Sequence, residues 1–316
     1  MKYRRLGNSG VKVSEISLGG WLTFGGTVDD KTTERIVAAA IDSGVNFIDL
    51  ADIYARGEAE RALGPILKAY TRSDLVISSK LFWPMSDNIN DRGLSRKHIF
   101  ESIDNTLKRL QTDYLDIYFC HRFDPETDVE ETVRAMDDLI RQGKILYWGT
   151  SVWEADQIAA AASMADKYLC YRPQVEQPRY NMIDRHIESD IMPTCARLGL
   201  GLVVWSPLAM GLLTGKYNDG VPRGSRAQTS EWLKSSLNEA NLVKVRKLMA
   251  IAGDLKITPG QMALAWVLRR SEISSAITGA TRPEHIKSNV VASDIELGQD
   301  VLTEIENILN DTVNTD

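Results

Sequence analysis

The sequence predicts an α/β fold, a (β/α)8 barrel of the TIM type with an N-terminal β-hairpin and extra C-terminal helices. The chain has 316 residues and is 43% hydrophobic, which is enough to bury one large core, so we expect residues 1–316 to form a single domain. Short apolar runs rich in β-branched residues alternate with segments of helical period. Each strand-helix pair takes about 40 residues, and eight such pairs favour a closed parallel barrel over an open sheet.

The expected elements follow in chain order. A β-hairpin turns at Asn8 to Gly10, because Asn and Gly suit tight turns between antiparallel strands. Apolar residues recur at helical spacing in 31–44, 95–110, 128–143 and 154–168. The segment 210–232 fits neither period and leads into a further helix, and so long a connection after a strand indicates a functional role. The eight barrel strands are expected at 15–20, 47–51, 75–80, 115–121, 145–151, 173–177, 202–208 and 275–280.

Composition and charge disfavour several classes of protein. The formal net charge is -6 and no run is rich in Lys and Arg, so nucleic acid is not an expected partner. Cys120, Cys170 and Cys195 are far apart, and neither they nor the histidines have metal-ligand spacing, so we expect no disulfide and no metal. No stretch of about 18 apolar residues and no apolar leader occur, which predicts a cytoplasmic protein without a membrane span.

Polar residues end several of the apolar runs, and in such barrels the active site lies at the C-terminal ends of the strands. Four of them titrate: Asp49, Tyr54, Lys80 and His121. A lysine ammonium beside a tyrosine favours the phenolate, so we expect it to lower the phenol pKa from about 10 and improve proton donation. An aspartate would keep that ammonium charged, and a neutral histidine can hydrogen-bond a carbonyl oxygen.

Seven ordered motifs resemble the aldo-keto reductase superfamily over nearly the whole chain. They are GVNFIDLADIYARGEAERALG, VISSK, YLDIYFCHRFDP, ILYWGTSVW, EQPRYNM, WSPLAMGLLTGKY and TGATRPEHIKSNV. Within the superfamily the sequence looks closest to the potassium-channel β-subunit branch, which implies a possible tetramer. The resemblance gives Asp49, Tyr54, Lys80 and His121 the catalytic tetrad positions. Channel β subunits carry Asn at the position of His121. At this position the sequence therefore differs from them and resembles the ordinary enzymes of the superfamily.

The expected cofactor also comes from the resemblance. No G-x-G-x-x-G follows a strand, so a Rossmann site is not predicted. The family instead implies NADPH or NADP+ laid across the barrel mouth, with its 2'-phosphate near a helix N-terminus that carries a cation. Ser151 and Gln177 would hold the nicotinamide amide, and Trp205 or the aromatic residue of EQPRY would line its ring. The implied cofactor contacts are Trp21, Asp49, Ser151, Gln177, Trp205, Ser206, Pro207, Leu208, Gly211, Lys216, Arg226, Gly279, Thr281, Arg282, His285 and Asn289.

The resulting hypothesis is an NADPH-dependent reductase in which hydride passes to an aldehyde or ketone carbon while Tyr54 donates a proton. The expected substrate contacts are Trp21, Tyr54, Phe82, Trp83 and His121. Trp21, Phe82 and Trp83 could equally be plain core, and Asp49 with Lys80 a structural ion pair. Two other functions remain open. One is a Schiff-base lyase that uses Lys80, and the other is a slow NADPH-binding regulatory subunit like the channel β subunits.

Overall fold

The structure is a computed structural model that describes residues 1–311 except 223–224, 226, 228–232 and 234–235. Eight parallel strands close a barrel in the order in which they occur along the chain, with the last strand paired to the first. Each overlaps one of the eight predicted ranges, so the predicted barrel is confirmed. The strands are β3 Ile16–Gly19, β4 Phe47–Asp49, β5 Val76–Leu81, β6 Leu115–Cys120, β7 Ile145–Thr150, β8 Val175–Glu176, β9 Gly201–Trp205 and β10 Ile273–Thr278.

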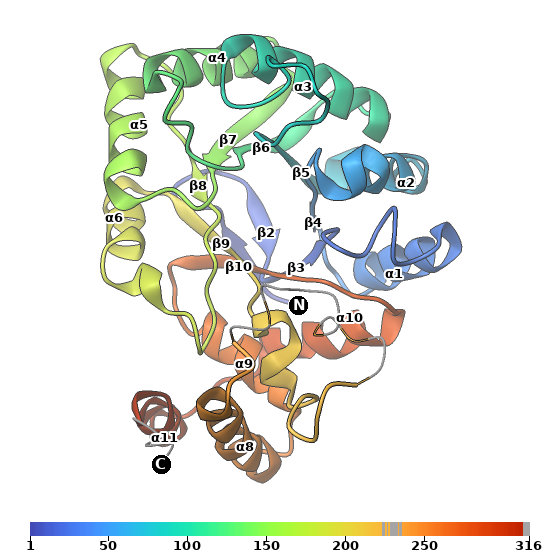
Figure 1. Cartoon of the computed structure of the whole chain (residues 1–316), viewed down its shortest axis with the longest axis vertical. Coiled ribbons are helices and arrows are strands. Elements are labelled where there is room, and N and C mark those ends of the chain that lie inside the picture. The colour runs from blue at the N-terminus through green and yellow to red at the C-terminus, as the bar shows by residue number, and fades with distance from the viewer. Residues whose placement is uncertain (223–224, 226, 228–232, 234–235, 312–316) are drawn as a thin grey trace.

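Helices surround the central strands, as Figure 1 shows. The surrounding helices are α1 Asp30–Asp42, α2 Glu58–Leu67, α3 Arg96–Leu110, α4 Val129–Arg141, α5 Ala155–Lys167, α6 Ile191–Leu198, α9 Pro259–Leu268 and α10 Pro283–Val290. Two further helices, α8 Glu239–Asp254 and α11 Gln299–Asn310, contact each other at one end of the long axis, outside this ring (Figure 1). They are the extra C-terminal helices that the sequence predicts. Among the described residues, no helix combines the length and apolarity needed to cross a bilayer.

The predicted N-terminal hairpin is formed by β1 Tyr3–Arg5 and β2 Lys12–Ser14, which pair antiparallel. Leu6 and Val13 from this hairpin are fully buried and join the apolar cluster inside the barrel. That cluster includes Phe47 and Val76, which lie near the starts of β4 and β5. The hairpin therefore covers the N-terminal end of the barrel, and the opposite end, where the strands finish, is the open one.

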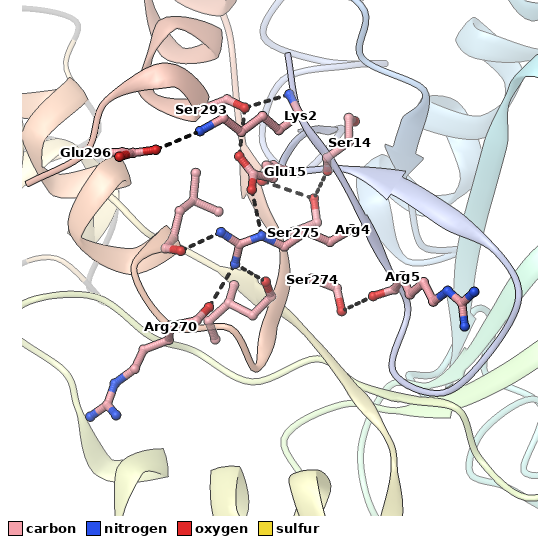
Figure 2. Close-up of polar contacts among 12 residues, drawn as sticks. Lys2, Arg4, Arg5, Ser14, Glu15, Arg270, Ser274, Ser275, Ser293 and Glu296 are labelled. Atoms are coloured by element: carbon pink, nitrogen blue, oxygen red, sulfur yellow. Dashed lines mark hydrogen bonds and ion pairs between the residues drawn. The ribbon is translucent and has the colours of Figure 1, made fainter.

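Arg4 joins the hairpin to the last turn of the barrel (Figure 2). Its Nε donates to Glu15 Oε1 at 2.6 Å. The two terminal nitrogens of its guanidinium donate to the carbonyl oxygens of Leu268, Arg270 and Ile273 at 2.6 to 2.8 Å. These carbonyls lie at the end of α9 and the start of β10, where the last carbonyl groups of the helix have no N–H donor within it. One side chain thus satisfies the backbone between the last two elements that close the barrel.

Strand alternation decides which residues face the interior of the barrel. Phe47, Val76, Phe119, Val175 and Val203 all belong to the inner apolar cluster. Counting in twos from these residues brings polar or aromatic side chains inward at the strand ends, namely Asp49, Lys80, His121, Gln177 and Trp205. The strands are also in matched register, since Asp49 pairs with Ser78 and Lys80 with Phe119. The fold therefore gathers these side chains at one end of the barrel.

Candidate active site

Lys80 lies at the centre of the cluster at the C-terminal end of the barrel. Its ammonium forms an ion pair with Asp49 Oδ2 at 2.6 Å, and both side chains are almost completely buried. The same nitrogen donates to the Leu50 carbonyl oxygen at 2.6 Å and to the Tyr54 hydroxyl at 3.2 Å. An ammonium has three N–H donors, and each has an acceptor here. The structure thus brings together three of the four residues predicted to form the tetrad.

Asp49 accepts hydrogen bonds from three directions. Besides Lys80, the Ser78 hydroxyl donates to Oδ1 at 2.7 Å and the Gln177 amide nitrogen donates to the same oxygen at 3.0 Å. Ser78 was missed by the sequence reasoning, although it precedes Lys80 by two residues on the same face of β5. Because its NH2 group is held by Asp49, the amide of Gln177 has a fixed orientation. Both amide oxygen and carboxylate are therefore positioned before any ligand arrives.

Tyr54 follows β4 in a 3-10 turn, Tyr54–Gly57, in which Ala55 and Arg56 have positive φ angles of 49° and 53°. Burial, and after it the negative charge of Asp49, raise the pKa of Tyr54 well above its usual value. The prediction that Lys80 lowers this pKa is therefore wrong. Asp49 largely neutralises the ammonium, so Lys80 offsets only part of the cost of burying a phenolate. Tyr54 is consequently a neutral phenol that retains its proton at working pH.

His121 directly follows β6, and its backbone N–H extends the ladder by donating to the Leu81 carbonyl oxygen at 2.9 Å. Burial and the positive charges of Lys80 and Arg122 hold its pKa well below the usual value, so the imidazole is neutral, as predicted. The ring centroid lies 6.1 Å from that of Tyr54, edge to face. Its Nδ1 is buried and has no hydrogen-bond partner within the part of the chain that the structure describes. Such an orphaned polar atom beside a phenol favours a site that awaits a polar ligand.

Aromatic side chains border this cluster. Phe82 and Trp83 contact each other with ring centroids 5.1 Å apart, and Trp83 lies 6.3 Å from the His121 ring. Trp21 and Trp205 form a second edge-to-face pair at 6.3 Å. The side chain of Trp83 is 37% exposed, and those of Trp21, Phe82 and Trp205 are partly exposed. This partial exposure favours a wall around the site over plain core packing.

The aromatic residue of EQPRY lies elsewhere. Tyr180 is fully buried, stacks on Trp266 at 5.5 Å, and donates to Glu188 through its hydroxyl. Of the two aromatic residues considered for the nicotinamide ring, only Trp205 therefore lies in the cluster. Two surface cavities, of 460 and 600 Å³, also lie away from it, one between α2 and α3 and one beside the hairpin. The contacts described above, rather than a cavity, thus define the candidate site.

Several residues expected to contact a cofactor lie in the loop after β9. Ser206 has a φ of 55°, its hydroxyl accepts from the Met210 N–H at 3.1 Å, and Pro207 and Leu208 follow it. At Gly211 φ is 97°, and an added Cβ would lie 2.8 Å from the Lys216 ammonium. The cation therefore sits directly over a backbone that has no side chain. Ser151 is buried at the end of β7, where its hydroxyl donates to the Gln177 carbonyl oxygen at 2.9 Å. Arg226 lies outside the described residues.

The other expected cofactor residues lie around the start of α10, just after β10 and the exposed Gly279. Arg282 is the N-cap residue, and its side chain makes no capping hydrogen bond. Its Nε lies 2.9 Å from His285 Nε2, and the exposed Thr281 precedes it. Asn289 lies, half-buried, in the last turn of the same helix. A guanidinium and a hydroxyl at a helix N-terminus suit a phosphate, so these residues fit a phosphate-bearing cofactor.

The sequence reasoning missed two charged residues near the site. Arg122 follows His121, donates to the His121 carbonyl oxygen, and has its Cζ atom 5.6 Å from the centroid of the Trp83 ring. Asp52 is fully buried between Asp49 and Tyr54 in the chain, and burial with the nearby charge of Glu60 raises its pKa to about 8. Their place within the motifs HRFDP and DLADIY was visible, but their burial and partners depend on the folded structure.

Comparisons with known proteins show the family to which the chain is similar. The sequence model of the Aldo/keto reductase family matches residues 15–310. A protein of Oryza sativa subsp. japonica is 46% identical over 302 residues, covering 93% of this chain and 92% of its own. One of Arabidopsis thaliana is 46% identical over 318 residues, covering 98% and 97%. Both are named "Probable voltage-gated potassium channel subunit beta". The resemblance inferred from the motifs is thus confirmed.

Proposed function

Because the chain belongs to the Aldo/keto reductase family, we propose that it is an NADPH-dependent oxidoreductase that reduces aldehyde or ketone carbonyls to alcohols. In the reverse direction this is alcohol dehydrogenase activity. One observation carries the proposal. Asp49, Lys80 and Tyr54 form a buried chain of contacts at 2.6 and 3.2 Å, and a neutral His121 lies beside the phenol. A proton donor and a second hydrogen-bonding group thus lie side by side.

Each member of this group has a distinct role in the proposal. Tyr54 transfers its hydroxyl proton to the carbonyl oxygen, and His121 holds that oxygen through a hydrogen bond. Lys80 donates a hydrogen bond to the phenolate that forms, which offsets part of the cost of placing a charge in a buried site. Asp49 keeps the ammonium charged and oriented. NADPH supplies the hydride that the carbonyl carbon accepts.

We also propose how the chain holds this cofactor. Ser151 and Gln177 bind the nicotinamide amide, because both lie at the strand ends in fixed orientation. Lys216 and Arg282, which is the N-cap residue of α10, bind the phosphate groups. The support is charge, because Lys216 and Arg282 are cations in the segments that follow β9 and β10. Cations in these segments suit the phosphate groups of a ligand.

A regulatory function is the second candidate, and the names of the relatives favour it. A regulatory subunit would bind NADPH tightly and turn over very slowly. The lyase alternative has less support, because a Schiff-base lysine must be a neutral amine. All three N–H donors of the Lys80 ammonium have acceptors, one of them a carboxylate. These contacts stabilise the charged form, which is not nucleophilic.

The test is an NADPH fluorescence titration followed by an aldehyde panel on the same sample. We expect binding and reduction of 4-nitrobenzaldehyde, and Tyr54→Phe should lose at least about two orders of magnitude in turnover, the scale of a lost general acid. Cofactor affinity should stay close to that of the wild type. Tyr3→Phe, in the hairpin at the other end of the barrel, is the matched control. Binding without turnover supports the regulator, and a borohydride-trapped adduct on Lys80 supports the lyase.

A further inference from the structure

We propose that Arg122 selects carbonyl substrates that also carry a carboxylate group. The inference rests on the proposed function and names the substrate class of the same site. The observation behind it is a guanidinium at the open end of the barrel, next in the chain to His121, to which no carboxylate of the described residues is paired. The substrate would therefore be an oxo acid, with the carbonyl at Tyr54 and the carboxylate at Arg122.

The position of Arg122 follows from the end of β6. His121 continues the strand ladder, and the next residue donates from its guanidinium back to the His121 carbonyl oxygen. The Cζ atom lies 5.6 Å from the centroid of the Trp83 ring, which is itself 6.3 Å from the His121 ring. The side chain is partly buried rather than extended into solvent. Its charge is thus held on the aromatic wall beside the proton donor.

The neighbouring cations are paired with carboxylates, whereas Arg122 has no such partner among the residues that the structure describes. Lys80 pairs with Asp49 at 2.6 Å, and Arg179, which lies over the Trp205 ring, pairs with Asp184 at 3.2 Å. Within the described ranges no carboxylate lies within 4.0 Å of the Arg122 guanidinium. A partly desolvated cation without an anion is costly, so its presence at the site favours an anionic ligand.

Glu176 is a buried carboxyl group whose negative charge acts on Arg122. Its two oxygens, however, accept hydrogen bonds from other groups. One oxygen accepts from the Thr150 hydroxyl at 2.5 Å and the other from the Val152 N–H at 2.7 Å. Burial raises the pKa of Glu176 to about 7, which weakens its negative charge at neutral pH. Glu176 therefore does not replace the missing partner.

Guanidinium chemistry indicates the kind of anion. Its planar fork matches the two oxygens of a carboxylate, and an arginine stays charged at any working pH. The Trp83 ring offers an apolar surface to the part of the substrate that joins the two groups. A charge-assisted contact of this type is expected to favour the acid over its neutral ester by about tenfold to a hundredfold.

The experiment compares 2-, 3- and 4-carboxybenzaldehyde with their methyl esters, using NADPH and measuring kcat/KM. At least one acid should be preferred over its ester about tenfold or more in the wild type. Arg122→Met and Arg122→Gln should bring that ratio close to one, and the second variant keeps a donor for the His121 carbonyl if the first fails to fold. Arg179→Met is the matched control, since it removes a paired cation and should leave the ratio unchanged. A preference for a phosphorylated aldehyde over every acid would overturn the carboxylate assignment.

A binding measurement separates the two proposals. Calorimetric titration of the matching hydroxymethylbenzoates and their esters, with NADP+ present, reports recognition of the anion without turnover. If no aldehyde is reduced but the acid binds in an Arg122-dependent way, the reductase proposal fails and the Arg122 inference stands. If aldehydes are reduced but acid and ester behave alike, or the preference survives in both Arg122 variants, the inference is wrong. Absence of both reduction and acid binding overturns both.

Discussion

Replacing Asp49 with Asn removes the negative charge that faces Lys80 and hardly changes the shape of the side chain. At 2.6 Å, and with an effective dielectric constant of about 20, the lost attraction is about 6 kcal/mol. Part of it is offset because the carboxylate no longer has to be desolvated. Breaking a buried pair from one side costs about 3 to 5 kcal/mol in free energy of unfolding, and we expect Asp49→Asn to lie in this range. Urea unfolding followed by circular dichroism measures it.

The double variant Asp49→Asn/Lys80→Met is the control, because it removes both charges. It should be more stable than Asp49→Asn alone if the cost comes from the unpaired ammonium. The pH dependence gives a second check. Burial lowers the pKa of Lys80, and losing Asp49 lowers it further below the unfolded value of about 10.4. The unfolded state then binds more protons, so the deficit of Asp49→Asn should shrink as pH rises from 7 to 10. A deficit below about 1 kcal/mol that does not depend on pH would refute this reasoning.

Three further predictions concern other parts of the structure. His121→Asn should lower single-turnover oxidation of bound NADPH by a fixed aldehyde about a hundredfold, since the shorter amide misplaces its donor, and should leave NADPH binding intact; equal rates would make His121 a packing residue. The wild type should bind NADPH at least about tenfold more tightly than NADH, and Arg282→Ala should reduce that preference in titrations at fixed ionic strength; equal wild-type affinities would contradict the phosphate site. The pKa of Asp52 is raised to about 8 from about 3.9, so the native state binds more protons between these values and stability falls as pH rises. Asp52→Asn should therefore reduce the slope of the free energy of unfolding against pH, measured with urea between pH 5 and 8, by up to about 1.4 kcal/mol per pH unit. An unchanged slope would mean that Asp52 is ionised throughout.

The strands and the location of the candidate site could be predicted because both depend on local patterns. Short runs of β-branched residues favour strands through their local sequence. Because side chains alternate along a strand, Lys80 faces the barrel interior as Val76 does, and His121 faces it as Phe119 does. Once the strands are parallel and closed, their ends must meet at one rim. The convergence of Asp49, Lys80 and His121 is therefore a consequence of alternation and topology.

The electrostatics of the site could not be predicted in the same way. The pKa of Tyr54 depends on how deeply the phenol is buried and on Asp49 neutralising Lys80, and both are properties of the packed structure. The same holds for Arg122, whose proposed role depends on the absence of a nearby carboxylate among the described residues rather than on any pattern in the chain. Asp52 reads as an ordinary acidic residue in a turn, yet the fold buries it beside Glu60.

The Arg4 contacts also have a consequence for biosynthesis. Arg4 leaves the ribosome near the beginning of translation, but its carbonyl partners are 264 to 269 residues further along the chain. At about 5 to 20 residues per second, this separation amounts to roughly ten seconds to a minute during which the guanidinium can pair with Glu15 but has none of its three carbonyl partners. Over the same period β3 has only one neighbour, because β10 has not yet been made. The nascent chain therefore exposes an open sheet edge until translation is nearly complete, which makes chaperone binding in that interval more important than for proteins whose ends fold independently.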